Sequence, residues 1–249
     1  MGSPANGAIA GRRGQLSMET IFLGVDVAGA SNTWVCGLSP RADGLTLSLL
    51  PGTQSLDSVV RYTEQHHVVA VAIDAQLTSA ISEEKGFRTS DIQLRRLLPV
   101  EFRNWVASQN SLMAVPLRGR QLAEALAPIV GTIIETHPRA CLLFGSPDLI
   151  DAIRNYKDAD SDSHCRALWG RLVERFKISS DVSEMSDGAI DSVVCALVAY
   201  LFHHQPDQLL KLQHGTPGKT GRGPFYVFRP EAYRLVGEVD ILPKEVSEL

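Results

Sequence analysis

The chain has 249 residues, of which 44% are apolar and 21% are charged, and this composition excludes a protein that is disordered throughout. The formal net charge of −4 excludes a globally basic nucleic-acid binder, so any contact with a phosphate backbone requires a local basic patch. No apolar run approaches the roughly 18 residues that a membrane span needs. We therefore expect a cytoplasmic protein without a membrane partner.

The length favours one elaborated domain over two. Residues 1–17 are rich in Gly, Ala and Ser and predict a disordered extension, which leaves 18–249 as a single domain with helical insertions. The Arg12-Arg13 pair does not begin a twin-arginine signal, because Asp26 soon interrupts the apolar stretch that follows. The cysteines include no CxxC pair, and their spacing indicates buried, reduced thiols.

The first half of the chain predicts an antiparallel meander, a helix and a buried strand. Ser55 can cap a helix that runs to about residue 67. The near-continuous apolar run 68–73 ends at Asp74 and is typical of a strand buried on both faces. The meander strands are expected at 21–28, 33–39 and 45–50, with Asp43-Gly44 as a hairpin signal.

The second half predicts helices with two further short strands. The strongest helical signal is at 187–204, where apolar residues recur at helical spacing from Ile190 to Leu201. Other helices are expected at 89–98, 119–129, 147–156 and 163–177, and strands at 132–135 and 225–228.

This order of elements is that of the ribonuclease H-like fold. We expect an α/β domain with a mixed five-stranded sheet, in which the three-strand meander continues into parallel strands, and with helices on both faces. Right-handed crossovers would place the strands that end at Asp74 and Glu135 beside the first strand.

Four carboxylates are candidates for a metal site. Asp26, Asp74 and Glu135 lie at or near the ends of apolar strands, where a charge is costly unless it is paired or bound to a metal. Asp191 lies one turn into the apolar helix 187–204, and Asp187, one turn earlier, is a possible auxiliary ligand. Hard oxygen ligands favour Mg²⁺ or Mn²⁺, and a two-ion site would suit phosphodiester hydrolysis.

Five segments in the same order are similar to the predicted nucleases of domain-of-unknown-function family 429. This resemblance spans about residues 21–230 and implies a ribonuclease H-like fold with Asp26, Asp74, Glu135 and Asp191 as its acidic site. The segments are GVDVAGASNTW (24–34), AIDAQLT (72–78), the Arg88, Asp91 and Arg95 pattern, IIETHPRA (133–140) and DGAIDSVVCALVAYL (187–201).

Several further residues are candidates for substrate binding. Arg88, Arg95 and Arg103 can share one helical face and contact phosphates, or equally form an ordinary solvated face. Lys219 lies in a Gly-rich loop that lacks the full phosphate-loop pattern, although it can still touch a phosphate. His137 can point the same way as Glu135, but a structural, hydrogen-bonded histidine is favoured about two to one.

The leading hypothesis is therefore a divalent-metal-dependent nuclease that acts on nucleic acid or another phosphodiester. The first alternative is a catalytically inactive module that binds nucleic acid or a protein on the same fold. The second alternative is a relative of the actin-like kinases and ATPases, because GVDVAGASNTW also resembles the first phosphate loop of those proteins. Those proteins need two copies of the fold, so this alternative ranks last.

Overall fold

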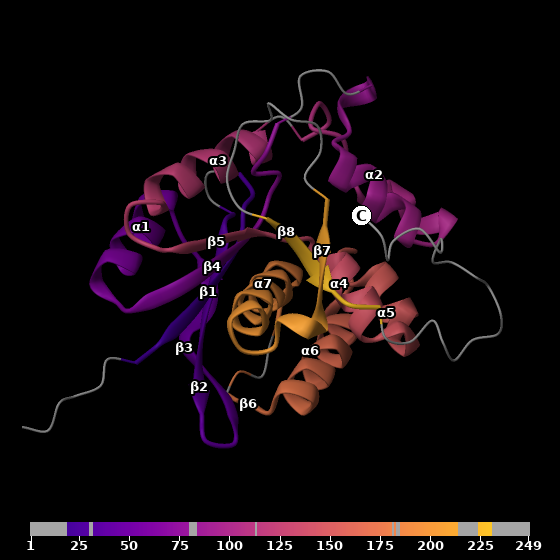
Figure 1. Cartoon of the computed structure of the whole chain (residues 1–249). Coiled ribbons are helices and arrows are strands. Elements are labelled where there is room, and N and C mark those ends of the chain that lie inside the picture. Colours follow the sequence, from indigo (N-terminus) through magenta and orange to yellow (C-terminus); the bar gives the residue numbers. More distant parts are fainter. Residues whose placement is uncertain are drawn as a thin grey trace, which may run out of the picture.

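The computed structural model describes residues 19–29, 32–79, 84–112, 114–180, 182, 185–213 and 224–230. These residues form an α/β structure around one mixed, eight-stranded sheet with the strand order β6-β3-β2-β1-β4-β5-β8-β7 (Figure 1). The expectation of five strands is wrong. The predicted disordered segment 1–17 lies outside the described residues.

The five expected central strands are present. The strand that ends at Asp74 lies beside the first strand as predicted, whereas the strand that ends at Glu135 lies one place further out. The meander strands pair antiparallel, whereas β4 runs parallel to β1 and β5 runs parallel to β4. Their bounds are β1 (Ile21–Asp26), β2 (Trp34–Arg41), β3 (Gly44–Thr53), β4 (Val68–Asp74) and β5 (Thr132–Glu135).

Three short strands extend the sheet at its two edges. The predicted closing strand, β8 (Phe225–Phe228), pairs parallel to β5, and β7 (Leu209–Leu212) pairs antiparallel to β8. At the other edge β6 (Ile178–Ser179) pairs with β3. The sequence predicted neither β6 nor β7, because β6 has only two residues and the LLKL segment of β7 does not alternate between apolar and polar residues.

Helices cover both faces of the sheet, as the sequence predicted (Figure 1). On one face, α1 (Leu56–Gln65) and α3 (Ala114–Leu126) pack on alternate residues of the central strands, among them Leu23 and Ile73. Ser55 caps α1 as expected, since its hydroxyl accepts a hydrogen bond of 3.1 Å from the amide of Ser58.

The other face carries the larger core, centred on α7 (Asp187–His204). Phe22, Ala70 and Ala72 belong to this core. Most residues of α7 are buried, rather than a single stripe, because the helix contacts the sheet and also packs against α4 and α6. The helices of this layer are α4 (Pro138–Gly145), α5 (Ile150–Asn155), α6 (Asp162–Phe176) and α7.

The remaining described helices are short. They are α2 (Thr89–Leu97) and the 3-10 turns η1 (Glu84–Gly86), η2 (Val100–Trp105), η3 (Pro147–Leu149) and η4 (Pro206–Gln208). Helix α4 was not predicted, although Pro138 at its first turn is a recognised helix-start signal. None of the helices in the described part of the chain combines the length and apolar character required to cross a bilayer.

Candidate metal centre

The alternation of side chains along β1 and β4 places Asp26 and Asp74 next to each other. The two residues are register partners in the parallel pair of strands. Asp26 lies four residues after Phe22 and Asp74 two residues after Ala72, so both side chains leave the sheet on the face that α7 covers.

Helix α7 adds Asp191 to this pair. Ser186 caps the helix by accepting a hydrogen bond of 3.2 Å from the amide of Ala189. Gly24 permits a close approach of α7 to β1, because a Cβ at this position would lie 2.0 Å from the carbonyl oxygen of Ser192. Only a residue without a side chain therefore fits here.

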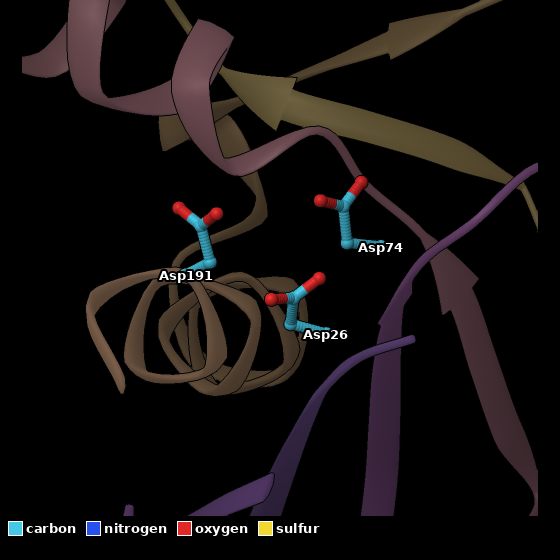
Figure 2. A group of neighbouring side chains, drawn as sticks. All are labelled: Asp26, Asp74 and Asp191. Carbon is cyan, nitrogen blue, oxygen red and sulfur yellow. The ribbon is translucent and has the colours of Figure 1, made fainter. Parts of the chain in front are cut away.

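The three carboxylates converge. One oxygen of each of Asp26, Asp74 and Asp191 lies within 4.8 Å of the others, and Figure 2 shows the side chains gathered between the ends of β1 and β4 and the first turns of α7. Asp191 is fully buried, whereas Asp26 and Asp74 are half-buried. We call this set the aspartate cluster.

Two residues that the sequence did not predict contact the aspartate cluster. The Tyr156 hydroxyl donates a hydrogen bond of 2.7 Å to Oδ1 of Asp191, and the Lys157 ammonium forms an ion pair with Oδ2. Both residues lie where α5 ends, before α6 begins. No local pattern marks them, because their role depends on the packing of α5 and α6 near α7.

The electrostatics of the cluster favour a bound cation. Burial and the charge of Asp191 raise the pKa of Asp26 to about 7. Burial, followed by the charges of Asp26 and Asp191, raises the pKa of Asp74 well above its ordinary value. Burial alone would lower the pKa of Lys157, but Asp191 and Asp74 outweigh it and the pKa is raised. Three adjacent carboxylates fit the oxygen-ligand chemistry of Mg²⁺ or Mn²⁺.

A cavity of about 280 Å³ lies beside the cluster and reaches one of its three carboxylates, that of Asp74. Asp74 and Lys157 both line this cavity, together with Arg139. Its other lining residues include Arg88, Asp91, Glu135 and His137, together with Val27, Gln76, Trp105, Leu112, Val115 and Phe225. A small polar group in the cavity can therefore meet the carboxylate of Asp74 and the cationic side chains of Lys157 and Arg139.

Glu135 does not belong to the aspartate cluster. Its register partner in β4 is Ile73, not Asp74, so its side chain leaves the sheet on the opposite face. There both of its oxygens accept hydrogen bonds from Arg88, and Oε2 also accepts one of 2.9 Å from the amide of Leu77. The expected fourth ligand is instead the partner of a buried cation.

Arg88 is buried, with 1% of its surface exposed, and the expectation that it shares a phosphate-contacting face with Arg95 is wrong. Its guanidinium donates to Asp91, Glu135 and Thr78 through all five N–H groups. The buried group has no donor left for a substrate. We call Arg88, Asp91 and Glu135 the arginine network.

The other predicted site residues also lie outside the aspartate cluster. Asp187 is half-buried and is not part of the three-carboxylate group, although its charge contributes to the raised pKa of Asp26. Arg95 donates hydrogen bonds to the carbonyl groups of Arg103 and Val106. Lys219 lies outside the described residues.

His137 has the structural role that the sequence favoured. Its Nδ1 accepts a hydrogen bond of 3.2 Å from the amide of Ala140 and so caps α4. Its Nε2 lies 3.2 Å from the carbonyl oxygen of Trp105, which can only accept, so Nε2 carries the proton. Burial lowers the pKa of His137, in keeping with a neutral ring.

The sequence matches no model of a known protein family, and no curated protein matches it significantly. The resemblance to family 429 therefore stays a prediction that rests on the five segments.

Proposed function

We propose that this protein is a divalent-metal-dependent phosphodiester hydrolase with a ribonuclease H-like fold, acting on nucleic acid or a related phosphodiester. The observation that carries the proposal is the convergence of Asp26, Asp74 and Asp191 from three separate elements. Such a placement of partly or fully buried carboxylates is costly unless a cation compensates for it. The arrangement of β1 to β5 and the resemblance to family 429 support the fold assignment.

Asp26 and Asp74 would hold the ion, with Asp191 completing the set. When bound, a divalent ion lowers the pKa of a coordinated water and polarises a phosphoryl oxygen. Tyr156 and Lys157 hold the carboxylate of Asp191 through one oxygen each. Lys157 and Arg139 line the cavity, where their positive charges would attract and orient the phosphate of the substrate.

The direct test is cleavage of single-stranded, duplex, hybrid and branched nucleic acids, and of a small phosphodiester, with Mn²⁺ or Mg²⁺. Wild type should cleave at least one substrate. The activity of Asp26→Asn should be more than about 100-fold lower, because even residues that only support metal ligands contribute about 10–100-fold. Asp187→Asn is the matched control, since Asp187 lies on α7 but outside the three-carboxylate group. Equal activity in wild type and Asp26→Asn would exclude the proposal.

One observation favours the inactive binding module as a second candidate. Both oxygens of Asp191 already have partners, and one of these is a cation. If the protein is this inactive binding module, the Lys157 ammonium takes the place of any metal ion, and Mn²⁺ should not raise the thermal stability of the wild type. Stabilisation by Mn²⁺ that disappears in Asp26→Asn would exclude this candidate.

A further inference from the structure

We propose that the aspartate cluster takes one divalent ion rather than two, and that the Lys157 ammonium permanently occupies the place of the second cation. This inference rests on the proposed function and assigns Lys157 as a positioning residue of the same site. Three features of the described residues support it: the donors of Asp191, the partners of Glu135 and the charge of the cluster.

The carboxylate of Asp191 is the first feature. Oδ1 accepts from the Tyr156 hydroxyl and Oδ2 from the Lys157 ammonium, in a side chain that is fully buried. A carboxylate that bridges two ions presents a free lone pair from each oxygen toward them. Here each oxygen already accepts from a fixed donor, and the ammonium on Oδ2 repels any ion that would approach the same oxygen. A single contact, from Oδ1 to an ion shared with Asp26 and Asp74, is compatible with these bonds.

The partners of Glu135 are the second feature. A second ion needs additional oxygen ligands, and Glu135 is the fourth carboxylate that the sequence predicted for the site. Its oxygens instead accept from Arg88 and from the amide of Leu77, and its side chain starts from the other face of the sheet. Mg²⁺ commonly binds through only one or two carboxylates and several waters. The three aspartates therefore supply enough ligands for one ion.

Charge balance is the third feature. Three carboxylates and the Lys157 ammonium carry two net negative charges when all four groups are ionised. One divalent ion neutralises this set in the substrate-free protein, whereas a second would leave two positive charges in a partly buried site. The ammonium stays next to the cavity, because the Lys157 side chain is 37% exposed and lines it.

The experiment measures metal stoichiometry in the folded protein by native mass spectrometry and calorimetric titration with Mn²⁺. Wild type should bind one ion at the cluster. Lys157→Met should bind two, since it removes the positive charge and frees Oδ2 of Asp191. Lys157→Arg keeps the charge and should bind one. Lys211→Met is the matched control on the exposed edge strand β7 and should also bind one.

A second measurement does not depend on the folding of a variant. The electron paramagnetic resonance spectrum of Mn²⁺-loaded wild type should be that of isolated ions, even with excess metal. A spectrum of coupled Mn²⁺ pairs, or two ions bound to wild type, would overturn the inference and leave the proposed hydrolase intact. One ion in both wild type and folded Lys157→Met would also overturn it. Absence of bound Mn²⁺ from wild type and from every variant would instead exclude the proposed function.

Discussion

The aspartate cluster is a partly buried group of charges and the arginine network a fully buried one, and their charges are compensated in different ways. In the arginine network, one guanidinium uses all five of its donors on two carboxylates and a hydroxyl. In the aspartate cluster, three carboxylates share one ammonium, and that ammonium contacts only Asp191 among them in the described structure. The hydrogen bonding of the guanidinium is complete and leaves the network one net negative charge, whereas the cluster with its ammonium carries two when all groups are ionised.

This difference distinguishes a structural group of charges from a site for a ligand. A buried charge with complete hydrogen bonding stabilises the arrangement of its elements, here the start of α2 against the end of β5. A group with uncompensated charge gains stability from an added cation. The two groups should therefore respond differently to mutation and to added metal.

Arg88→Met should lower the free energy of unfolding by about 3–5 kcal/mol, because it leaves Asp91 and Glu135 buried without their cation. Urea denaturation measures this change. Arg171→Met is the control: Arg171 pairs with Asp148 on the surface, and its loss should cost no more than about 1 kcal/mol. Similar small losses in both variants would show that the arginine network is not structural.

Gly24→Ala should disturb the aspartate cluster through the backbone. The new Cβ would lie 2.0 Å from the carbonyl oxygen of Ser192 and 2.2 Å from the amide nitrogen of Ala196, so α7 must move away from β1. We expect a loss of about 3 kcal/mol in unfolding free energy and a Mn²⁺ affinity at least about 10-fold weaker, since Asp191 moves with the helix.

The control for this variant is Gly170→Ala in α6. A Cβ there meets no atom within 4 Å, so the substitution should raise stability by about 0.5–1 kcal/mol through the higher helix propensity of alanine. Unchanged stability and Mn²⁺ affinity in Gly24→Ala would contradict the close packing of α7 on β1 as the origin of the cluster.

The sequence predicted which strands end in carboxylates, but not on which face each carboxylate lies. Asp74 follows Ile73, and Glu135 follows Ile134, so both looked equivalent as strand-end acids. The register of β4 and β5 pairs Ile73 with Glu135 and thereby places the two acids on opposite faces. A register between strands that are distant in sequence depends on tertiary packing, which a single sequence does not specify.

The partners of these acids were harder still to predict. Lys157 follows α5 and reaches Asp191 on α7, and Arg88 precedes α2 and reaches Glu135 on β5. Each contact joins segments more than 30 residues apart. Apolar runs, turn residues and helical periodicity identified the central strands and most helices, because these patterns are local. Long side chains that cross between elements leave no periodic signal.

Asp26→Asn should change how stability depends on pH in the absence of metal. The pKa of Asp26 is about 7 in the folded protein and has an ordinary value of 3.8, so the folded state binds the extra proton between these values. The free energy of unfolding should therefore decrease as pH rises from about 4 to about 7. The decrease should be about 1–2 kcal/mol because Asp26 remains partly exposed.

In Asp26→Asn this contribution disappears, and stability at pH 8 should exceed that of wild type. Thermal unfolding across this pH range measures the effect. Asp57→Asn changes an exposed carboxylate that pairs with Arg61 and should leave the wild-type profile intact. Identical profiles for wild type and Asp26→Asn would mean that the aspartates do not destabilise one another without a cation.

The smallest effect is expected for substitutions of His137, which lines the cavity. They test whether this residue binds the metal ion or only stabilises the fold. His137→Ala removes the cap of α4 and the bond to the Trp105 carbonyl, and should lower unfolding free energy by about 1 kcal/mol. Mn²⁺ affinity should stay unchanged, because both ring nitrogens bond to the backbone and neither is left to bind an ion. His137→Asn, which can still cap the helix, should recover part of the lost stability. A tenfold weaker Mn²⁺ affinity in both variants would instead make His137 a part of the metal site.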